Sequence, residues 1–165
     1  MNHRISAVIW RYAVALLVAF VGAGCASLRT ADSPADNPKD RAAIERRLQE
    51  ILAAAESKDF ERLDSYHAYG PKFTRYSGAS AERMNATGAR KGEHDGLVAV
   101  KGLKMRTRDL KIDLLGNVGI ATFILDYNFD SSGETVYRKD RSTIVFIKED
   151  GNWKITHEHL TPVQP

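Results

Sequence analysis

Three ionisable side chains stand in a row near the end of the chain: His157, Glu158 and His159. The residues around them are typical of a β-strand, in which successive side chains point to opposite faces. The two histidines therefore share one face, with Cα atoms about 6.7 Å apart, and Glu158 lies on the other face. A His-x-His pair can chelate a metal if His67, His94 or an acid elsewhere supplies a third ligand. Alternatively, the two histidines form hydrogen bonds at a sheet face or at a dimer seam.

Glu158 is the first candidate for acid–base chemistry. A carboxylate that faces a partly apolar pocket has a raised pKa, which a general acid or base near neutral pH requires. On the neighbouring strand, Arg138, Asp140 and Ser142 have the same parity as Glu158. A salt bridge from Arg138 or Arg141 to Glu158 or Asp140 would lower the pKa of the carboxylate and make it a structural strut. The salt bridge is the interpretation that we favour, and both carboxylates remain catalytic candidates.

Other catalytic signatures do not occur in the sequence. There is no Ser-His-Asp order, no Gly-rich phosphate loop and no Cys/His ligand set. The glycines at 88, 92 and 96 do not follow a strand, so they do not predict a nucleotide site. The single cysteine excludes an intrachain disulfide and a thiolate zinc cluster.

The first 24 residues are typical of an export signal. Residues 1–11 contain two arginines and no acid, residues 12–21 are ten uninterrupted apolar or aromatic residues, and Gly22-Ala23-Gly24 follows. Ten helical residues rise only about 15 Å, half of a hydrocarbon core of about 30 Å. We therefore predict an export signal over 1–24, with a single transmembrane anchor as the alternative.

Cys25 follows the small residues directly, and this arrangement resembles the lipobox of bacterial lipoproteins. The resemblance implies cleavage before Cys25, attachment of a diacylglycerol to its sulfur, and anchoring at a membrane surface in the cell envelope, facing the periplasm. The alternative is an ordinary secretory signal and a soluble secreted protein. Loss of residues 1–24 leaves 22 basic and 21 acidic residues, so the net charge falls from +3 to +1. We therefore expect no nucleic-acid partner.

The remaining chain predicts a flexible tether over 25–36 and one domain over 37–165. Asn37 can cap a helix that begins at Pro38, and apolar residues then recur at helical spacing as far as Ala55. Asp59 can cap a second, short helix. The sequence therefore places its helices at the start of the domain.

Strands follow these helices. A short strand is predicted over 72–77, whereas the glycine-containing stretch 78–102 predicts a broken helix or a mobile cover. From Lys104 the apolar period changes to two, and four long strands separated by turns form an antiparallel meander. Segregated helices and strands indicate an α+β fold.

The end of the domain carries a family resemblance. The strand with Arg138, Asp140, Ser142 and Thr143 is followed by Asp150-Gly151-x-Trp153-Lys154-Ile155 and then by His157-Glu158-His159. Together with the segment SKDFERLDSYHA at 57–68, this pattern resembles the SnoaL-like branch of the nuclear transport factor 2-like superfamily. The resemblance covers about residues 42–162.

The resemblance implies a cone-shaped fold, in which N-terminal helices pack on a curved antiparallel sheet and a pocket is enclosed. The pocket-facing parity in relatives is that of Thr156, Glu158 and Leu160, which favours hydrogen-bonded histidines over a metal site. We therefore expect neither a metal nor a cofactor. Tyr66 and Tyr76 lie on elements that line the mouth of the cone in relatives.

The fold by itself does not specify a function, so three functions remain. The first is binding of a small apolar molecule by a homodimer that associates through the convex face of the sheet, with Tyr66, Tyr76, Arg138 and Ser142 as ligand-binding residues. The second is an acid–base enzyme of the isomerase, dehydratase or cyclase type, with Glu158, Asp140 and Tyr66 in catalysis. The third is an envelope module that binds another protein.

Overall fold

The computed structural model describes residues 37–78 and 80–164. The predicted export signal, Cys25 and the tether over 25–36 lie outside the described residues. Within these ranges, no helix is both long enough and apolar enough to cross a membrane.

The first two helices begin where the sequence predicts. Helix α2 spans Pro38–Ser57, and the side chain of Asn37 accepts a hydrogen bond from the amide of Lys39. Helix α3 spans Phe60–Ser65, and Asp59 accepts a hydrogen bond from the amide of Arg62. Both caps satisfy amide groups that have no partner within the first turn of a helix, which explains why these boundaries could be predicted.

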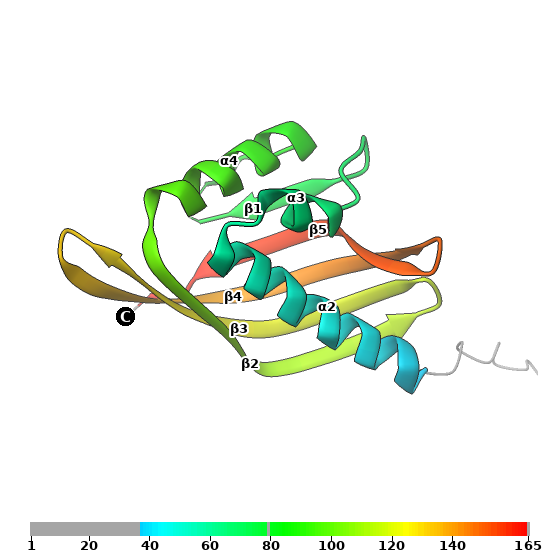
Figure 1. Cartoon of the computed structure of the whole chain (residues 1–165). Helices are drawn as coiled ribbons and strands as arrows, with labels where there is room; N and C mark the ends of the chain where they lie inside the picture. Colours follow the sequence, from blue (N-terminus) through cyan, green and yellow to red (C-terminus); the bar gives the residue numbers. More distant parts are fainter. Residues whose placement is uncertain (1–36, 79, 165) are drawn as a thin grey trace, which may run out of the picture. The chain divides into compact units, whose positions relative to one another are not determined.

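One curved sheet carries the rest of the fold (Figure 1). The four long strands form the predicted antiparallel meander, and a short strand pairs with the last of them in parallel, so the sheet is mixed rather than wholly antiparallel. The order across the sheet is β1-β5-β4-β3-β2. The strands are β1 (Thr74–Ser77), β2 (Lys101–Leu115), β3 (Val118–Ser131), β4 (Glu134–Glu149) and β5 (Asn152–Pro162).

The stretch 78–102 differs from its prediction. It contains one unbroken helix, α4 (Ala86–Ala99), and β2 begins at Lys101 rather than at Lys104. Asn85 caps this helix by accepting a hydrogen bond from the amide of Gly88. A good cap and the burial of Ala89 offset the low helix propensity of the glycines, which is why the expectation of a broken helix was wrong.

The core lies between α2 and the concave face of the sheet (Figure 1). Ile44 from α2 and Phe146 from β4 have no exposed surface, and Phe73 and Ile155 are 1% exposed. Trp153 and Phe123 are also buried. This packing holds α2 in a fixed position above the sheet.

Gly119 in β3 makes close contact with the first helix. A Cβ atom at this position would lie 2.3 Å from Cδ1 of Ile44 and 3.6 Å from Cδ2 of Leu114. Because Ile44 is completely buried, its side chain has no space into which it can move. We expect Gly119→Ala to lower the free energy of unfolding by about 1–3 kcal/mol, measured by urea denaturation.

A second substitution tests the cause. Ile44→Val removes the clashing Cδ1 atom and by itself costs about 0.5–1.5 kcal/mol. The double variant is therefore expected to lose less stability than the sum of the single variants. Gly96→Ala is the control, because a Cβ there meets nothing within 4 Å. If the losses of Gly119→Ala and Ile44→Val in free energy of unfolding simply added in the double variant, the contact between Gly119 and Ile44 would not limit packing.

Candidate functional site

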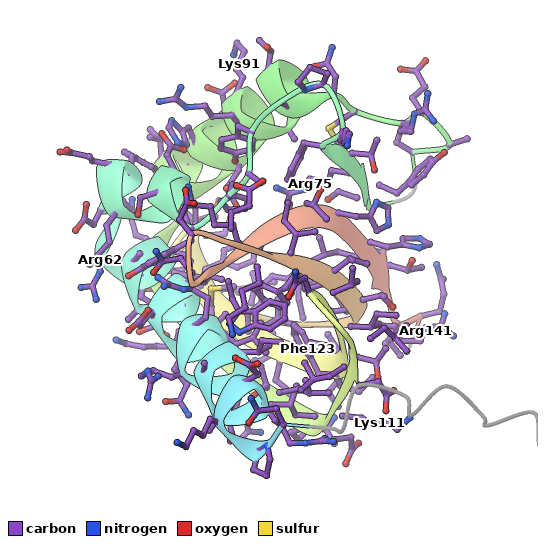
Figure 2. The ribbon with its side chains drawn as sticks, turned by 90° about the vertical axis from the view of Figure 1, so that its right-hand side faces the viewer. Arg62, Arg75, Lys91, Lys111, Phe123 and Arg141 are labelled. Carbon is purple, nitrogen blue, oxygen red and sulfur yellow. The ribbon has the colours of Figure 1, made fainter. Side chains whose placement is uncertain are left out.

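A cavity of about 340 Å³ lies between α2, α4 and the concave face of the sheet. Phe123 from β3 lies on its wall, whereas Arg141 and Lys111 are exposed on the other side of the sheet (Figure 2). Most of the wall is apolar, with contributions from Leu48, Ile51, Leu52, Leu97, Leu103, Met105, Leu125, Phe129, Ile144, Ile155 and Leu160. The charged residues on the wall are Arg75, Glu93, Asp140 and Glu158.

Four ionisable residues meet at one end of this cavity, and we call His67, Arg75, Glu93 and Glu158 the buried charge cluster. Nη1 of Arg75 lies 3.3 Å from Oε2 of Glu158 and 3.4 Å from Oε1 of Glu93. Nε2 of His67 lies 3.7 Å from Oε1 of Glu158 and 4.0 Å from Oε2 of Glu93. Each carboxylate therefore contacts both cationic partners.

Strand register brings the central pair together. Arg75 of β1 is the direct parallel partner of Glu158 of β5. An extra residue in β5, Thr156, forms a bulge opposite Val145 and Phe146. The expectation that Thr156 shares the inner face with Glu158 was therefore wrong: the bulge turns Ile155 and Glu158 inward together, and both are buried.

The backbone around His67 fixes the orientation of its ring. The amide of Ala68 donates to the carbonyl oxygen of Ile155, and the amide of Ile155 donates to that of Tyr66. Nδ1 of His67 lies 2.9 Å from the carbonyl oxygen of Leu63, so Nδ1 carries a proton and donates it. Nε2 is consequently the ring atom that faces the two carboxylates.

The environment of Glu158 stabilises its charged form. Its burial disfavours the carboxylate, but the charges of Arg75 and His67 outweigh burial and lower the pKa from 4.5 to about 2. In Glu93 the balance is reversed: burial and the negative charge of Glu158 raise the pKa, despite the opposing effect of His67 and Arg75. Burial also works against the charged form of His67, yet the adjacent carboxylates of Glu158 and Glu93 raise its pKa.

The net charge of the cluster depends on the protonation of His67 and Glu93. Arg75 and Glu158 carry full charges, so the cluster is neutral when a single proton resides on either His67 or Glu93. The contacts between these groups are longer than hydrogen bonds. Among the described residues, no hydrogen-bond partner is found for Nε2 of His67, Nε and Nη1 of Arg75, or Oε2 of Glu158. Buried polar atoms in this condition are uncommon and mark candidate functional sites.

The cluster also contains the donor atoms of a metal site. One ligand atom each from His67, Glu93 and Glu158 lie within 4.8 Å of one another, and these residue types bind divalent cations. However, the guanidinium of Arg75 contacts both carboxylates and supplies the positive charge that a cation would bring. The donor set therefore fits a metal poorly, because the cation would meet Arg75 at close range.

The His-x-His pair lies apart from this cluster. Nδ1 of His157 lies 2.8 Å from Oγ1 of Thr74, and Nε2 of His159 lies 3.1 Å from Oγ1 of Thr161. The ring of Tyr76 packs near both imidazoles. The two histidines are thus hydrogen-bonded at a sheet face, as the second interpretation of the sequence proposed.

Asp140 lies elsewhere on the cavity wall. The hydroxyl of Tyr127 donates to its Oδ2 atom at 3.5 Å, and Oδ1 is buried with no hydrogen-bond partner among the described residues. Burial raises the pKa of Asp140, although the bond from Tyr127 opposes this effect. Neither Arg138 nor Arg141 forms the salt bridge that the sequence suggested: Arg138 is exposed and donates to the carbonyl oxygen of Tyr137.

Of the residues proposed from sequence, Glu158 and Asp140 lie on the cavity wall, and the others do not. The hydroxyl of Tyr66 accepts a 2.6 Å hydrogen bond from Nε of Arg62, and Tyr76 lies beside the two strand histidines. Ser142 is buried, without a hydrogen-bond partner for Oγ. The ligand-binding roles of Tyr66, Tyr76, Arg138 and Ser142 stay predictions.

Sequence reasoning missed Arg75 and Glu93. Arg75 occurs in the predicted short strand, where the alternation Phe73-x-Arg75-x-Ser77 was a signal that it faces inward. Glu93 lies in a segment for which no regular helix was predicted, so no face could be assigned to it. His67 was considered as a third ligand for the histidine pair and not as a partner of Glu158.

A family model for the SnoaL-like domain matches residues 44–165, and the chain therefore belongs to the SnoaL-like domain family. Its fold is that of the nuclear transport factor 2-like proteins, as the sequence resemblance predicted. No curated protein sequence matches the chain.

Solved structures are similar in fold. A Streptomyces avermitilis protein of the nuclear transport factor 2-like family, provisionally named a dehydratase, has a TM-score of 0.70 and 16% identity, over 77% of this chain and 98% of its own. A Novosphingobium aromaticivorans protein, provisionally named a scytalone dehydratase, has a TM-score of 0.68 and 15% identity, over 76% and 85% of the two chains. A Pseudomonas putida protein of unknown function has a TM-score of 0.65 and 12% identity, over 76% and 88%. At these identities the likeness establishes the fold alone.

The lowered pKa of Glu158 predicts a pH-dependent stability. A pKa of about 2 against an ordinary value of 4.5 means that the charged carboxylate stabilises the fold fully above pH 4.5 and loses this effect as the pH falls through 2. We expect Glu158→Gln to lower the free energy of unfolding by about 3 kcal/mol or more at pH 7, because Arg75 and His67 lose a buried partner. The difference from the wild type should shrink between pH 4.5 and pH 2, as measured by urea unfolding.

Glu50→Gln is the matched control. Glu50 pairs with Arg47 at 3.0 Å on the surface of α2, and its side chain is 32% exposed. Such pairs contribute about 1 kcal/mol or less. If Glu158→Gln and Glu50→Gln lowered the free energy of unfolding equally at pH 7, the buried charge cluster would have no special role in stability.

Proposed function

We propose that the domain binds a small, largely apolar organic molecule in the cavity between α2, α4 and the sheet. The observation that carries this proposal is a cavity of about 340 Å³ with an apolar wall and a few converging polar groups at its ends. Small-molecule sites in proteins have volumes of about 300–1,000 Å³ and this same composition. The cavity is therefore of suitable size for a ligand with one or two rings.

The buried charge cluster supplies polarity at one end of the cavity. Arg75, Glu93 and Glu158 lie on the wall, so a polar group of the ligand can reach them. Their mutual contacts hold the side chains in place before a ligand binds, which lowers the entropy cost of association. Two fold neighbours with provisional dehydratase names are consistent with a cavity for small molecules.

Acid–base conversion of the bound molecule is a second candidate function. In this proposal His67 and Glu93 share one proton, supported by the 4.0 Å approach of their facing atoms and by the raised pKa of both groups. Glu93 lies on the cavity wall and is the group proposed to transfer the proton. Glu158 is less suited to this task, because its pKa is lowered to about 2.

Export, acylation of Cys25 and homodimerisation are further parts of the proposal. The first two are supported by the charged start, the short apolar run and the small residues before Cys25. Homodimerisation is supported by the family resemblance.

A variant that fills the cavity tests ligand binding. Gly96 of α4 lines the cavity and a Cβ there meets no atom within 4 Å, so a large side chain has open space at the cavity wall and can compete with a ligand for it. We expect the neutral fluorescent probe N-phenyl-1-naphthylamine to bind the wild-type domain with enhanced emission. Gly96→Leu should weaken this binding about tenfold or more, a loss of about 1.4 kcal/mol.

Val98→Leu provides the control on the same helix. Val98 is 63% exposed, so a larger side chain there should leave the affinity for the probe unchanged. Equal affinities of the wild type and Gly96→Leu would mean that the probe binds elsewhere, and the proposal would fail.

Nuclear magnetic resonance titration tests the second candidate. The imidazole signals of His67 should report a pKa above 6.5, because two carboxylates face its Nε2 atom. Glu93→Gln should lower that pKa, since one of these carboxylates loses its charge. Glu61→Gln, at an exposed position of α3, should not change it. A His67 pKa at or below 6.5 in the wild type would remove the basis for a shared proton.

A further inference from the structure

We propose that the ligand is an elongated, flat molecule with two hydrogen-bonding ends, a neutral acceptor such as a carbonyl at Arg75 and a donor such as a hydroxyl at Asp140. This inference rests on the proposed function, because it specifies the class of molecule that the same cavity takes. It follows from the positions of the polar groups on the cavity wall, from their unequal partners and from the two glycines of α4 on that wall.

The two polar ends lie far apart on one wall. Glu158 of β5 pairs directly with Arg75 of β1 on one side and with Ile144 of β4 on the other. Asp140 lies four residues from Ile144 along β4, which corresponds to about 13 Å of strand. Both ends line the same cavity, and the surface between them is apolar, with contributions from Phe123, Leu125, Ile144 and Leu160.

The Asp140 end favours a donor. Its carboxyl group is contacted by the hydroxyl of Tyr127 at 3.5 Å, a long hydrogen bond, and no arginine within residues 37–78 and 80–164 pairs with it. A carboxyl group keeps an acceptor oxygen whether it is charged or protonated. A hydroxyl or amine of the ligand is therefore the group that this end can bind.

The Arg75 end favours a neutral acceptor. A guanidinium has only donors, and the side chain of Arg75 lines the cavity and is 14% exposed. The guanidinium already contacts two carboxylates, Glu158 at 3.3 Å and Glu93 at 3.4 Å, so its positive charge is compensated. A ligand carboxylate would bring an uncompensated charge into this buried place, whereas a carbonyl would not.

The roof of the cavity favours a flat molecule. Gly92 and Gly96 lie on the wall one helical turn apart, and a Cβ at either position would meet nothing within 4 Å. The two glycines leave open space beside Glu93 and Leu97, which form the surface of α4 at the cavity. A ring system can lie against this surface across the apolar stretch between the two polar ends.

A set of four related compounds tests the inference by calorimetry and by displacement of N-phenyl-1-naphthylamine. The full probe is 4-acetyl-4′-hydroxybiphenyl; the truncated probes are 4-acetylbiphenyl, 4-hydroxybiphenyl and biphenyl. We expect the full probe to bind the wild-type domain most tightly, with each polar group contributing about a tenfold gain in affinity over the compound that lacks it.

Asp140→Ala identifies the end that binds the hydroxyl. In this variant the advantage of 4-acetyl-4′-hydroxybiphenyl over 4-acetylbiphenyl should disappear, while its advantage over 4-hydroxybiphenyl should persist. Asp95→Ala, at a surface position of α4 with a 62% exposed side chain, is the control and should preserve both advantages. The ligand series on the wild type provides a test that does not depend on how well any variant folds.

The outcomes separate the inference from the proposed function. If all four compounds bind equally well, the inference is overturned and ligand binding in the cavity stands. If none of them binds while N-phenyl-1-naphthylamine does, the inference alone is overturned; if the naphthylamine does not bind either, both are overturned. If Asp140→Ala still bound 4-acetyl-4′-hydroxybiphenyl more tightly than 4-acetylbiphenyl, the assignment of Asp140 to the hydroxyl end would be overturned.

Discussion

The ion pair between Arg75 and Glu158 is the interaction on which the arrangement of the site depends. Glu158 is 5% exposed, and a buried carboxylate is stable only with charged partners close by. Those partners are Arg75 from β1 and His67 from the segment after α3, and both of them also contact Glu93 from α4. The buried charge cluster therefore connects β5 with α4 and with β1, a strand of only four residues.

This constraint also divides the cavity into parts with different properties. Charges are gathered and balanced at one end, the middle of the wall is apolar, and Asp140 lies beyond it without a cationic partner. Within the cluster, the pKa of Glu158 is lowered because it contacts both cations, whereas that of Glu93 is raised by burial and by the charge of Glu158. The two glutamates have similar surroundings, but their neighbours lower the pKa of Glu158 and raise that of Glu93.

Local signals predicted most of the fold. The caps Asn37 and Asp59, the helical period of α2 and the alternation of the four long strands act over a few residues, so they can be recognised along the chain. The inward direction predicted for Glu158 is confirmed, whereas the inward direction predicted for Thr156 is wrong, because a bulge depends on how β5 pairs with β4. Helix α4 was missed because glycines weaken its local signal, and its stability comes from a cap and from burial of Ala89.

The sequence by itself determined the family, the order of helices and strands, and a carboxylate on the inner face of the last strand. Only the tertiary structure decided what that carboxylate contacts. Cross-strand pairing with Arg138 or Arg141 was the expectation from neighbouring segments, yet the partner is Arg75, which parallel pairing of β1 with β5 brings opposite Glu158. The physical reason is that burial, charge balance and pKa depend on groups far apart in the chain, and strand register and helix packing bring those groups within a few ångströms.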